Sequence, residues 1–166
     1  MGPDGLWSLE VCSDSDWTGD PNDQKSVGCY IIFLDGVPIA WRSRSQKVVS
    51  LSNSEAEFYA CAEAVREAPF GAQILLFLGI PEKAPVNVWI DNVGAIFMTK
   101  NRTSSSRTRH MDTRWWFGTQ LQEEDKLIKV QFVRTKENIS DLGTKNVNAE
   151  THQCHKGRLI SDRLKS

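Results

Sequence analysis

The stretch Leu9–Asp16 (LEVCSDSD) constrains the fold of this 166-residue chain more than any other segment. Leu9, Val11 and Cys12 place apolar or small side chains on both faces of an extended chain, which is typical of a strand buried inside a sheet. The strand runs directly into Asp14. The end of a sheet strand commonly holds a functional site, whereas a buried structural charge is rare. The sequence therefore predicts a central strand with a functional carboxylate at its end.

The composition is that of one globular domain, with 40% hydrophobic and 25% charged residues. The 20 Lys and Arg residues nearly balance the 21 Asp and Glu residues, so the net charge of −1 points by itself to no nucleic-acid or membrane partner. No signal peptide and no bilayer-spanning apolar run is recognisable, which predicts a protein that is not secreted and has no membrane partner. We expect a monomeric domain at residues 9–146, after a linker at 1–8 and before a tail at 147–166. For the tail, a loosely packed helix and a disordered segment are both open.

The cysteine pattern indicates no zinc ribbon or redox motif, because no two of the four cysteines have CxxC spacing. A reducing compartment is expected. His152, Cys154 and His155 form one local cluster without a distant fourth ligand, so packing without a metal is favoured over a zinc site.

Three strands are predicted to form an antiparallel meander in the first part of the chain. Val27–Leu34 contains β-branched and aromatic residues, and the following Asp35-Gly36 is a strong hairpin signal before a third strand at residues 37–44. Pro38 lies near the start of that third strand, which suits an edge position in the sheet.

A helix is predicted after the meander, in the run EAEFYACAEAVREA. Ser52 or Ser54 can cap this helix, and Ser54 with Glu57 has the spacing of a capping box. We expect the helix to stop near Pro69, since proline has no backbone N–H for the interior hydrogen bond. A second, short helix is expected at residues 71–78.

The second half of the chain alternates predicted strands and helices. Strands are expected at residues 86–91 and 127–133, and helices at 94–100, at 110–125 and from 138–144 onward. This order of elements predicts an α/β fold whose sheet has an antiparallel half and a parallel half. The helix at 110–125 is expected to face the core with Trp115, Trp116, Phe117 and Leu121.

Acidic residues stand at four comparable places near the ends of these elements. Asp14 and Asp91 end two strands, Asp141 lies early in the last predicted helix, and the first turn of the first helix offers Glu55 or Glu57. Glu57 shares its helix face with small apolar residues, so we expect it to point toward the sheet. Converging carboxylates would repel one another, and hard divalent cations such as Mg²⁺ or Mn²⁺ are the usual remedy. Separate surface acids are the alternative interpretation.

Four motifs together resemble a known family. CSDSDWTGD at residues 12–20, LSNSEAEFYA at 51–60, WIDNVGAI at 89–96 and NISDLGTK at 138–145 have the order and spacing of the ribonuclease H domain of copia-type retrotransposon reverse transcriptases. The resemblance implies the ribonuclease H fold, a five-stranded mixed sheet flanked by helices. It also implies four metal-binding catalytic acids: Asp14, Glu57, Asp91 and Asp141.

The resemblance further implies endonucleolytic hydrolysis of the RNA strand of an RNA–DNA hybrid, with two Mg²⁺ or Mn²⁺ ions that Asp14 would bridge. The polymerase domain of the parent polyprotein is the implied partner, in the cytoplasm (within virus-like particles) or in the nucleus. Contact with ribose 2′-hydroxyls would distinguish RNA from DNA, and the candidates for it are Asn92 and the backbone near Ser15 and Glu57.

A basic segment at residues 100–114 carries Arg107, Arg109 and His110. These residues predict contacts with the phosphates of a hybrid backbone, while a solvated loop and helix face is the alternative. The adjacent aromatic run at 115–117 is interpreted as core rather than as a platform for base stacking.

One departure from the family pattern leaves a second function open. The loop at 135–138 has no histidine where cellular relatives have one, which is usual in the copia group, but Gly143 stands where the family prefers an apolar residue. Glycine costs about 1 kcal/mol inside a helix, so Gly143 predicts a less rigid Asp141 and a weaker second metal site. The alternative is a ribonuclease H-like module of weak activity that binds nucleic acid or braces the polymerase.

Overall fold

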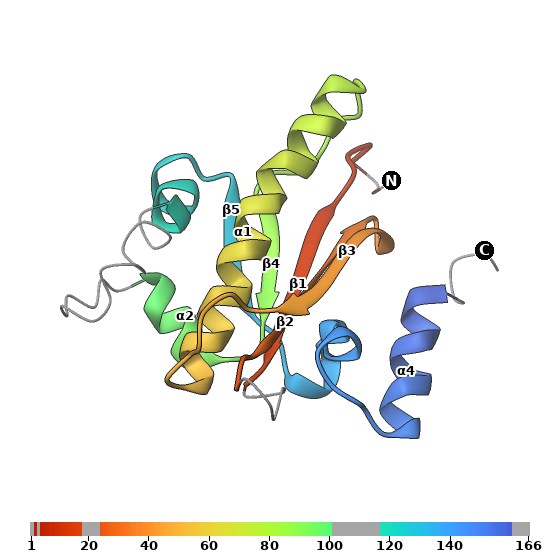
Figure 1. The fold of residues 1–166 in the computed structure, drawn as a ribbon. Helices are drawn as coiled ribbons and strands as arrows, with labels where there is room; N and C mark the ends of the chain where they lie inside the picture. Colours follow the sequence, from red (N-terminus) through yellow and green to blue (C-terminus); the bar gives the residue numbers. More distant parts are fainter. Residues whose placement is uncertain (1, 3, 18–23, 101–116, 161–166) are drawn as a thin grey trace.

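The structure of the chain is a computed structural model, which describes residues 2, 4–17, 24–100 and 117–160. A five-stranded sheet in the order β3-β2-β1-β4-β5 forms its centre, with helical elements on both faces (Figure 1). β1 pairs antiparallel with β2 and parallel with β4, which in turn is parallel to β5. The predicted α/β fold with a mixed sheet is therefore confirmed. The strands are β1 (Leu9–Asp16), β2 (Val27–Leu34), β3 (Val37–Ser45), β4 (Val86–Ile90) and β5 (Ile128–Phe132).

The meander of β1, β2 and β3 follows the predicted hairpin signal. Asp35 and Gly36 connect β2 to β3 with φ angles of +48° and +72°. Both lie in the left-handed region that a two-residue turn of this kind requires. β3 is the edge strand of the antiparallel half, as the position of Pro38 predicted.

Helix α1 (Asn53–Phe77) is one continuous helix that contains Pro69. The prediction of a stop near Pro69 and a separate helix at 71–78 is therefore wrong. Ala68 and Leu75 lie on either side of the proline and are both buried. Packing of both parts of the helix outweighs the single hydrogen bond that proline cannot donate.

The start of α1 also differs from the predicted capping box. Ser52 is the cap, and its Oγ accepts a hydrogen bond from the Glu55 N–H at 3.2 Å. The Glu55 carboxylate in turn accepts from the Leu51 N–H at 2.8 Å. The box of Ser54 and Glu57 is wrong because Ser54 lies inside the helix and the Glu57 side chain is buried.

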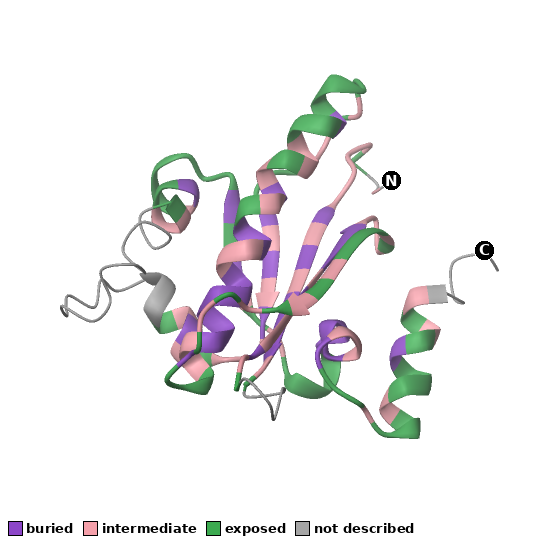
Figure 2. Cartoon of the chain, in the orientation of Figure 1, coloured by how far each residue is buried: buried purple, intermediate pink, exposed green. Residues whose placement is uncertain are grey.

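Two apolar clusters cover the two faces of the sheet. The larger one fills the space between α1 and the sheet, and the smaller one lies on the opposite face against η3 (Ile139–Gly143). Most of the part of α1 that follows Pro69 is exposed, although Leu75 still belongs to the larger cluster (Figure 2). Phe70, Ile74 and Phe77, which is 89% exposed, form an apolar stripe there.

The second half of the chain is less regular than predicted. The expected last helix at 138–144 is only the 3₁₀ helix η3, and a separate helix, α4 (Ala149–Ile160), follows within the predicted tail. Of the helix predicted at 110–125, residues 117–119 and η1 (Gln120–Glu124) are described. Leu121 faces the core as predicted, whereas Phe117 is 42% exposed; Trp115 and Trp116 lie outside the described residues. The other helical elements are α2 (Val93–Lys100) and η2 (Thr135–Glu137).

Across the described ranges, no helix combines the length and the apolar character that crossing a membrane would take.

Candidate metal centre

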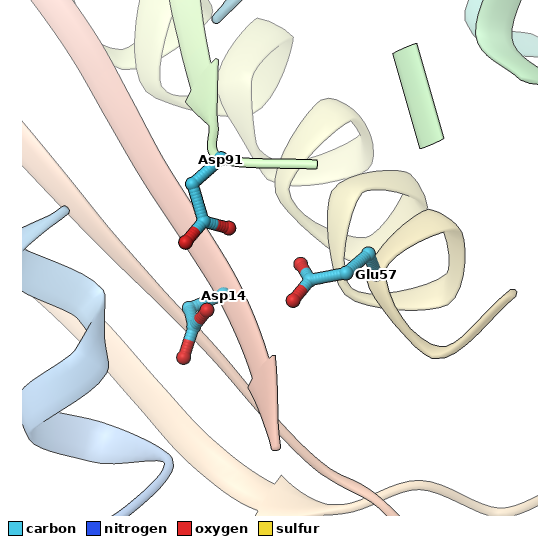
Figure 3. Close-up of side chains that lie close together, drawn as sticks. All are labelled: Asp14, Glu57 and Asp91. Atoms are coloured by element: carbon cyan, nitrogen blue, oxygen red, sulfur yellow. The ribbon is translucent and has the colours of Figure 1, made fainter. Parts of the chain in front are cut away.

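Three carboxylates from different elements converge at one edge of the sheet. Asp14 comes from the end of β1, Asp91 directly follows β4, and Glu57 comes from the second turn of α1 (Figure 3). One oxygen of each lies within 4.8 Å of an oxygen of both others. Asp14 and Glu57 are only 1% and 3% exposed. Glu57, and not Glu55, is thus the acid that points inward, as the pattern of its helix face predicted.

The pairing of the strands explains this convergence. β1 and β4 are parallel, with Cys12 opposite Trp89. Asp14 and Asp91 each come two residues after this pair, so they lie at the same level of the sheet. The carboxyl ends of parallel strands commonly form binding sites for this reason. The Ser15 N–H donates a hydrogen bond of 3.3 Å to Glu57 Oε1, which joins α1 to β1 at the site.

The carboxylates are electrostatically unfavourable without a cation. Burial, then the neighbouring Asp14 and Asp91, raise the pKa of Glu57 to about 9. Burial, with Asp141 adding to it, raises the pKa of Asp14 to about 6, and burial and Asp14 raise the pKa of Asp91. Glu57 Oε2 is buried and has no hydrogen-bond partner among the described residues. This cluster of oxygen donors fits a hard divalent cation, which would relieve all three shifts.

Asp141 lies beside Asp14 but is not one of the three clustered acids within the described residues. The Lys145 Nζ is 3.0 Å from Asp141 Oδ1 and 3.8 Å from Asp14 Oδ2. Burial alone would lower the pKa of Lys145. The negative charges of Asp14 and Asp141 nevertheless raise that pKa above its usual value. Thr144 donates a hydrogen bond from its hydroxyl to Asp14 Oδ2. Lys145 therefore compensates part of the negative charge of the site.

The segment that carries Asp141 is attached to the sheet by specific contacts. Asn138 Nδ2 donates a hydrogen bond of 2.9 Å to the Ser13 carbonyl, and the Ser43 hydroxyl donates to the Gly143 carbonyl. A Cβ at Gly143 would overlap the Cys29 Sγ on β2. The prediction that Gly143 carries the penalty of a glycine inside a helix is therefore wrong, because Gly143 is the last residue of a 3₁₀ helix. Its missing side chain permits the close approach of η3 to Cys29.

Ser15 and Asn92 both line the pocket that contains the three acids, which measures about 350 Å³. The Ser15 Oγ accepts a hydrogen bond of 3.2 Å from Gln46 Nε2, and Asn92 Oδ1 accepts one of 3.0 Å from the Ala95 N–H. Their contacts with nucleic acid stay a prediction. Three further predicted contact residues lie outside the described residues: Arg107, Arg109 and His110.

Sequence reasoning assigned no role to Thr144 and Lys145. The signal was present, because the motif NISDLGTK places them three and four residues after Asp141, on one side of a helical turn. Thr144 and Asp14 are 130 residues apart in sequence. Local spacing therefore cannot predict the contact between them.

Helix α4 contains all three residues of the predicted local cluster, His152, Cys154 and His155, but they differ in burial. His155 is fully buried, whereas His152 and Cys154 are exposed.

Several known proteins are similar in sequence to this chain. The chain is 35% identical over 138 residues to the retrovirus-related Pol polyprotein from transposon RE2 of Arabidopsis thaliana, which covers 83% of this chain and 9% of that protein. It is 36% identical over 140 residues to the Pol polyprotein from transposon TNT 1-94 of Nicotiana tabacum, with 84% of this chain and 10% of that protein covered. The chain thus spans about a tenth of the length of these Pol polyproteins. No protein-family model matches it.

Solved structures with the same fold include ribonuclease H domains. The N-terminal ribonuclease H domain of a Mycobacterium tuberculosis protein superposes with a TM-score of 0.58 at 11% identity, covering 89% of this chain and 97% of that one. A ribonuclease H1 isolated from compost, solved in complex with an RNA/DNA hybrid, has a TM-score of 0.57 at 10% identity, with 82% and 94% covered. The chain is therefore homologous to a segment of retrovirus-related Pol polyproteins from transposons, and that segment has the ribonuclease H fold.

Proposed function

We propose that this chain is a metal-dependent endoribonuclease that hydrolyses the RNA strand of RNA–DNA hybrids. The observation that carries the proposal is the convergence of Asp14, Glu57 and Asp91 within 4.8 Å of one another. The structural neighbour from compost binds an RNA/DNA hybrid with the same fold, which supports the choice of substrate. The polymerase domain of a parent polyprotein is the proposed partner, and the cytoplasm or nucleus is the proposed location.

Asp14, Glu57 and Asp91 would hold Mg²⁺ or Mn²⁺, and Asp141, next to Asp14, is the proposed fourth acid. Two such ions, when bound, lower the pKa of a water molecule and neutralise charge on the phosphate during in-line displacement. In the proposed hydrolysis, a water oxygen would bond to phosphorus while the P–O3′ bond breaks, and a proton lost by the water would end on O3′, which would give a 3′-hydroxyl and a 5′-phosphate.

Other residues of the chain hold these acids in place. The Ser15 N–H fixes one oxygen of Glu57, and the Thr144 hydroxyl fixes one oxygen of Asp14. Lys145 brings a positive charge to the pocket, where it attracts the phosphate. Ser15 and Asn92 are proposed to contact ribose 2′-hydroxyls, which only RNA has.

The test is cleavage of an end-labelled RNA–DNA hybrid with Mg²⁺ or Mn²⁺ by the parent chain and by Asp91→Asn. We expect the variant to lose more than about 100-fold in rate, since even partners that only orient a metal ligand contribute about 10- to 100-fold. Asp125→Asn changes the same functional group at an exposed position and should cleave like the parent. Equal rates for the parent and Asp91→Asn would overturn the site.

The weaker alternative, a module that binds nucleic acid without cleaving it, rested on Gly143. Because that glycine fits a close contact with Cys29, this argument against an ordered Asp141 no longer applies. Hybrid binding without cleavage, together with no heat of Mg²⁺ binding in calorimetry, would restore the alternative.

A further inference from the structure

A second pocket, separate from the three acids, lies between the first half of α1 and strands β2 and β3. It measures about 150 Å³, and we refer to it as the lateral pocket. Its lining holds one carboxylate, Glu63, and four cationic side chains: Arg42, Arg44, Lys47 and Arg66. The lateral pocket thus has a marked excess of positive charge.

Two of these cations are already paired. Arg44 lies 3.0 Å from Glu63, and Arg66 lies 3.1 Å from Glu63 and 2.8 Å from Glu67. Arg42 and Lys47 form no ion pair with any carboxylate in the part of the chain that the structure describes. Guanidinium and ammonium groups that converge in this way are suited to an anion, and to phosphate above all.

Gly28 of β2 lines the lateral pocket. A Cβ at that position would lie at ordinary contact distance, 3.4 Å from Gln46 Nε2 and 3.5 Å from the Ala60 Cβ. Tyr59 and Ala60 of α1 are buried and also line the lateral pocket. The lateral pocket is therefore a built concavity of the fold with charged side chains at its rim.

One side chain separates the lateral pocket from the acids. Gln46 lines the lateral pocket, and its Nε2 donates hydrogen bonds of 3.2 Å to Ser15 Oγ and 2.9 Å to the Ala56 carbonyl. Ser15 lines the pocket of the three acids. The two pockets therefore adjoin each other at the hydrogen bond between Gln46 and Ser15.

We propose that the lateral pocket binds a backbone phosphate of the nucleic acid, away from the phosphate that is cleaved, through Arg42 and Lys47. This inference rests on the proposed function and adds a second point of attachment on the β3 side of the domain. The phosphate belongs to the nucleic acid and not to a free anion, because the lateral pocket adjoins the site where the hybrid would lie.

The experiment measures hybrid affinity by fluorescence anisotropy over a series of salt concentrations, with Ca²⁺ in place of Mg²⁺ so that binding proceeds without cleavage. The plot of log K against log [salt] has a negative slope, and the double variant Arg42→Gln/Lys47→Gln should reduce the magnitude of that slope by about 1, the value of one lost phosphate contact. Arg42→Lys/Lys47→Arg keeps both charges and should keep most of the slope. Lys83→Gln removes one charge at the opposite end of the sheet, before β4, and should leave the slope unchanged.

Equal slopes for the parent and Arg42→Gln/Lys47→Gln would overturn this inference and leave the proposed function intact. Failure of the parent chain to bind the hybrid would instead overturn the proposed function. In a second arm, inorganic phosphate alone is titrated while the amide NMR signals of Gly28 and Gln46 are followed. Shifts in that arm combined with equal slopes would mean that the lateral pocket takes free anions, which also overturns the assignment to nucleic acid.

Discussion

At the scale of single residues, Glu57 carries a carboxylate whose ionised form is unfavourable in the folded chain. Its pKa is raised from 4.5 to about 9 by burial and by Asp14 and Asp91. Between these two pH values the folded state binds more protons than the unfolded state, so the free energy of unfolding falls as pH rises through this window. Glu57→Gln removes the titrating group and should remove this part of the pH dependence. Urea unfolding at pH 5, 7 and 9 with a chelator present measures both proteins, and identical pH profiles would contradict the prediction.

Gly143 is a residue whose lack of a side chain has a structural purpose. In Gly143→Ala the new methyl would overlap the Cys29 Sγ, so we expect a loss of about 1–3 kcal/mol in the free energy of unfolding, as for other overpacked sites. Cys29→Ala removes that sulfur and should recover part of the loss in the double variant. Gly118→Ala is the control, because its Cβ would meet only Val65 at 3.9 Å. A full loss that Cys29→Ala does not reduce would rule out this contact as the cause.

At the scale of the element, the start of α1 decides how Glu57 is presented. Ser52→Ala removes the cap hydrogen bond to Glu55 and should lower the free energy of unfolding by about 1 kcal/mol. Ser54→Ala leaves the cap intact and loses only a 3.3 Å hydrogen bond to Asn92, so its effect should be smaller. Thermal or urea unfolding followed by circular dichroism compares the two variants. A larger loss at Ser54 would favour the capping box that the sequence pattern suggested.

At the scale of the whole molecule, a bound cation would join β1, α1 and the end of β4. Mg²⁺ at about 100 times its Kd should stabilise the fold by about 2.7 kcal/mol, which raises the Tm by roughly 5–10 °C for a domain of this size. Differential scanning fluorimetry with Mg²⁺, then with excess chelator, measures the shift and its reversal. Asp91→Asn should reduce the shift and Asp125→Asn should not. Equal shifts in all three proteins would place the cation elsewhere.

Local sequence patterns determined much of this protein. The buried strand that ends in Asp14, the hairpin at Asp35-Gly36 and the inward face of Glu57 all depend on neighbouring residues or on a regular period along the chain. The order of strands and helices indicated the mixed sheet for the same reason.

Tertiary structure alone decided the features that depend on distant partners. Helix α1 continues through Pro69 because both of its halves pack on the sheet, and Gly143 is required because η3 approaches Cys29. Lys145 balances the charge of Asp14 although most of the chain separates them in sequence. Propensity and spacing report only local free energies, whereas these contacts exist only once the sheet has brought the two ends of the domain together.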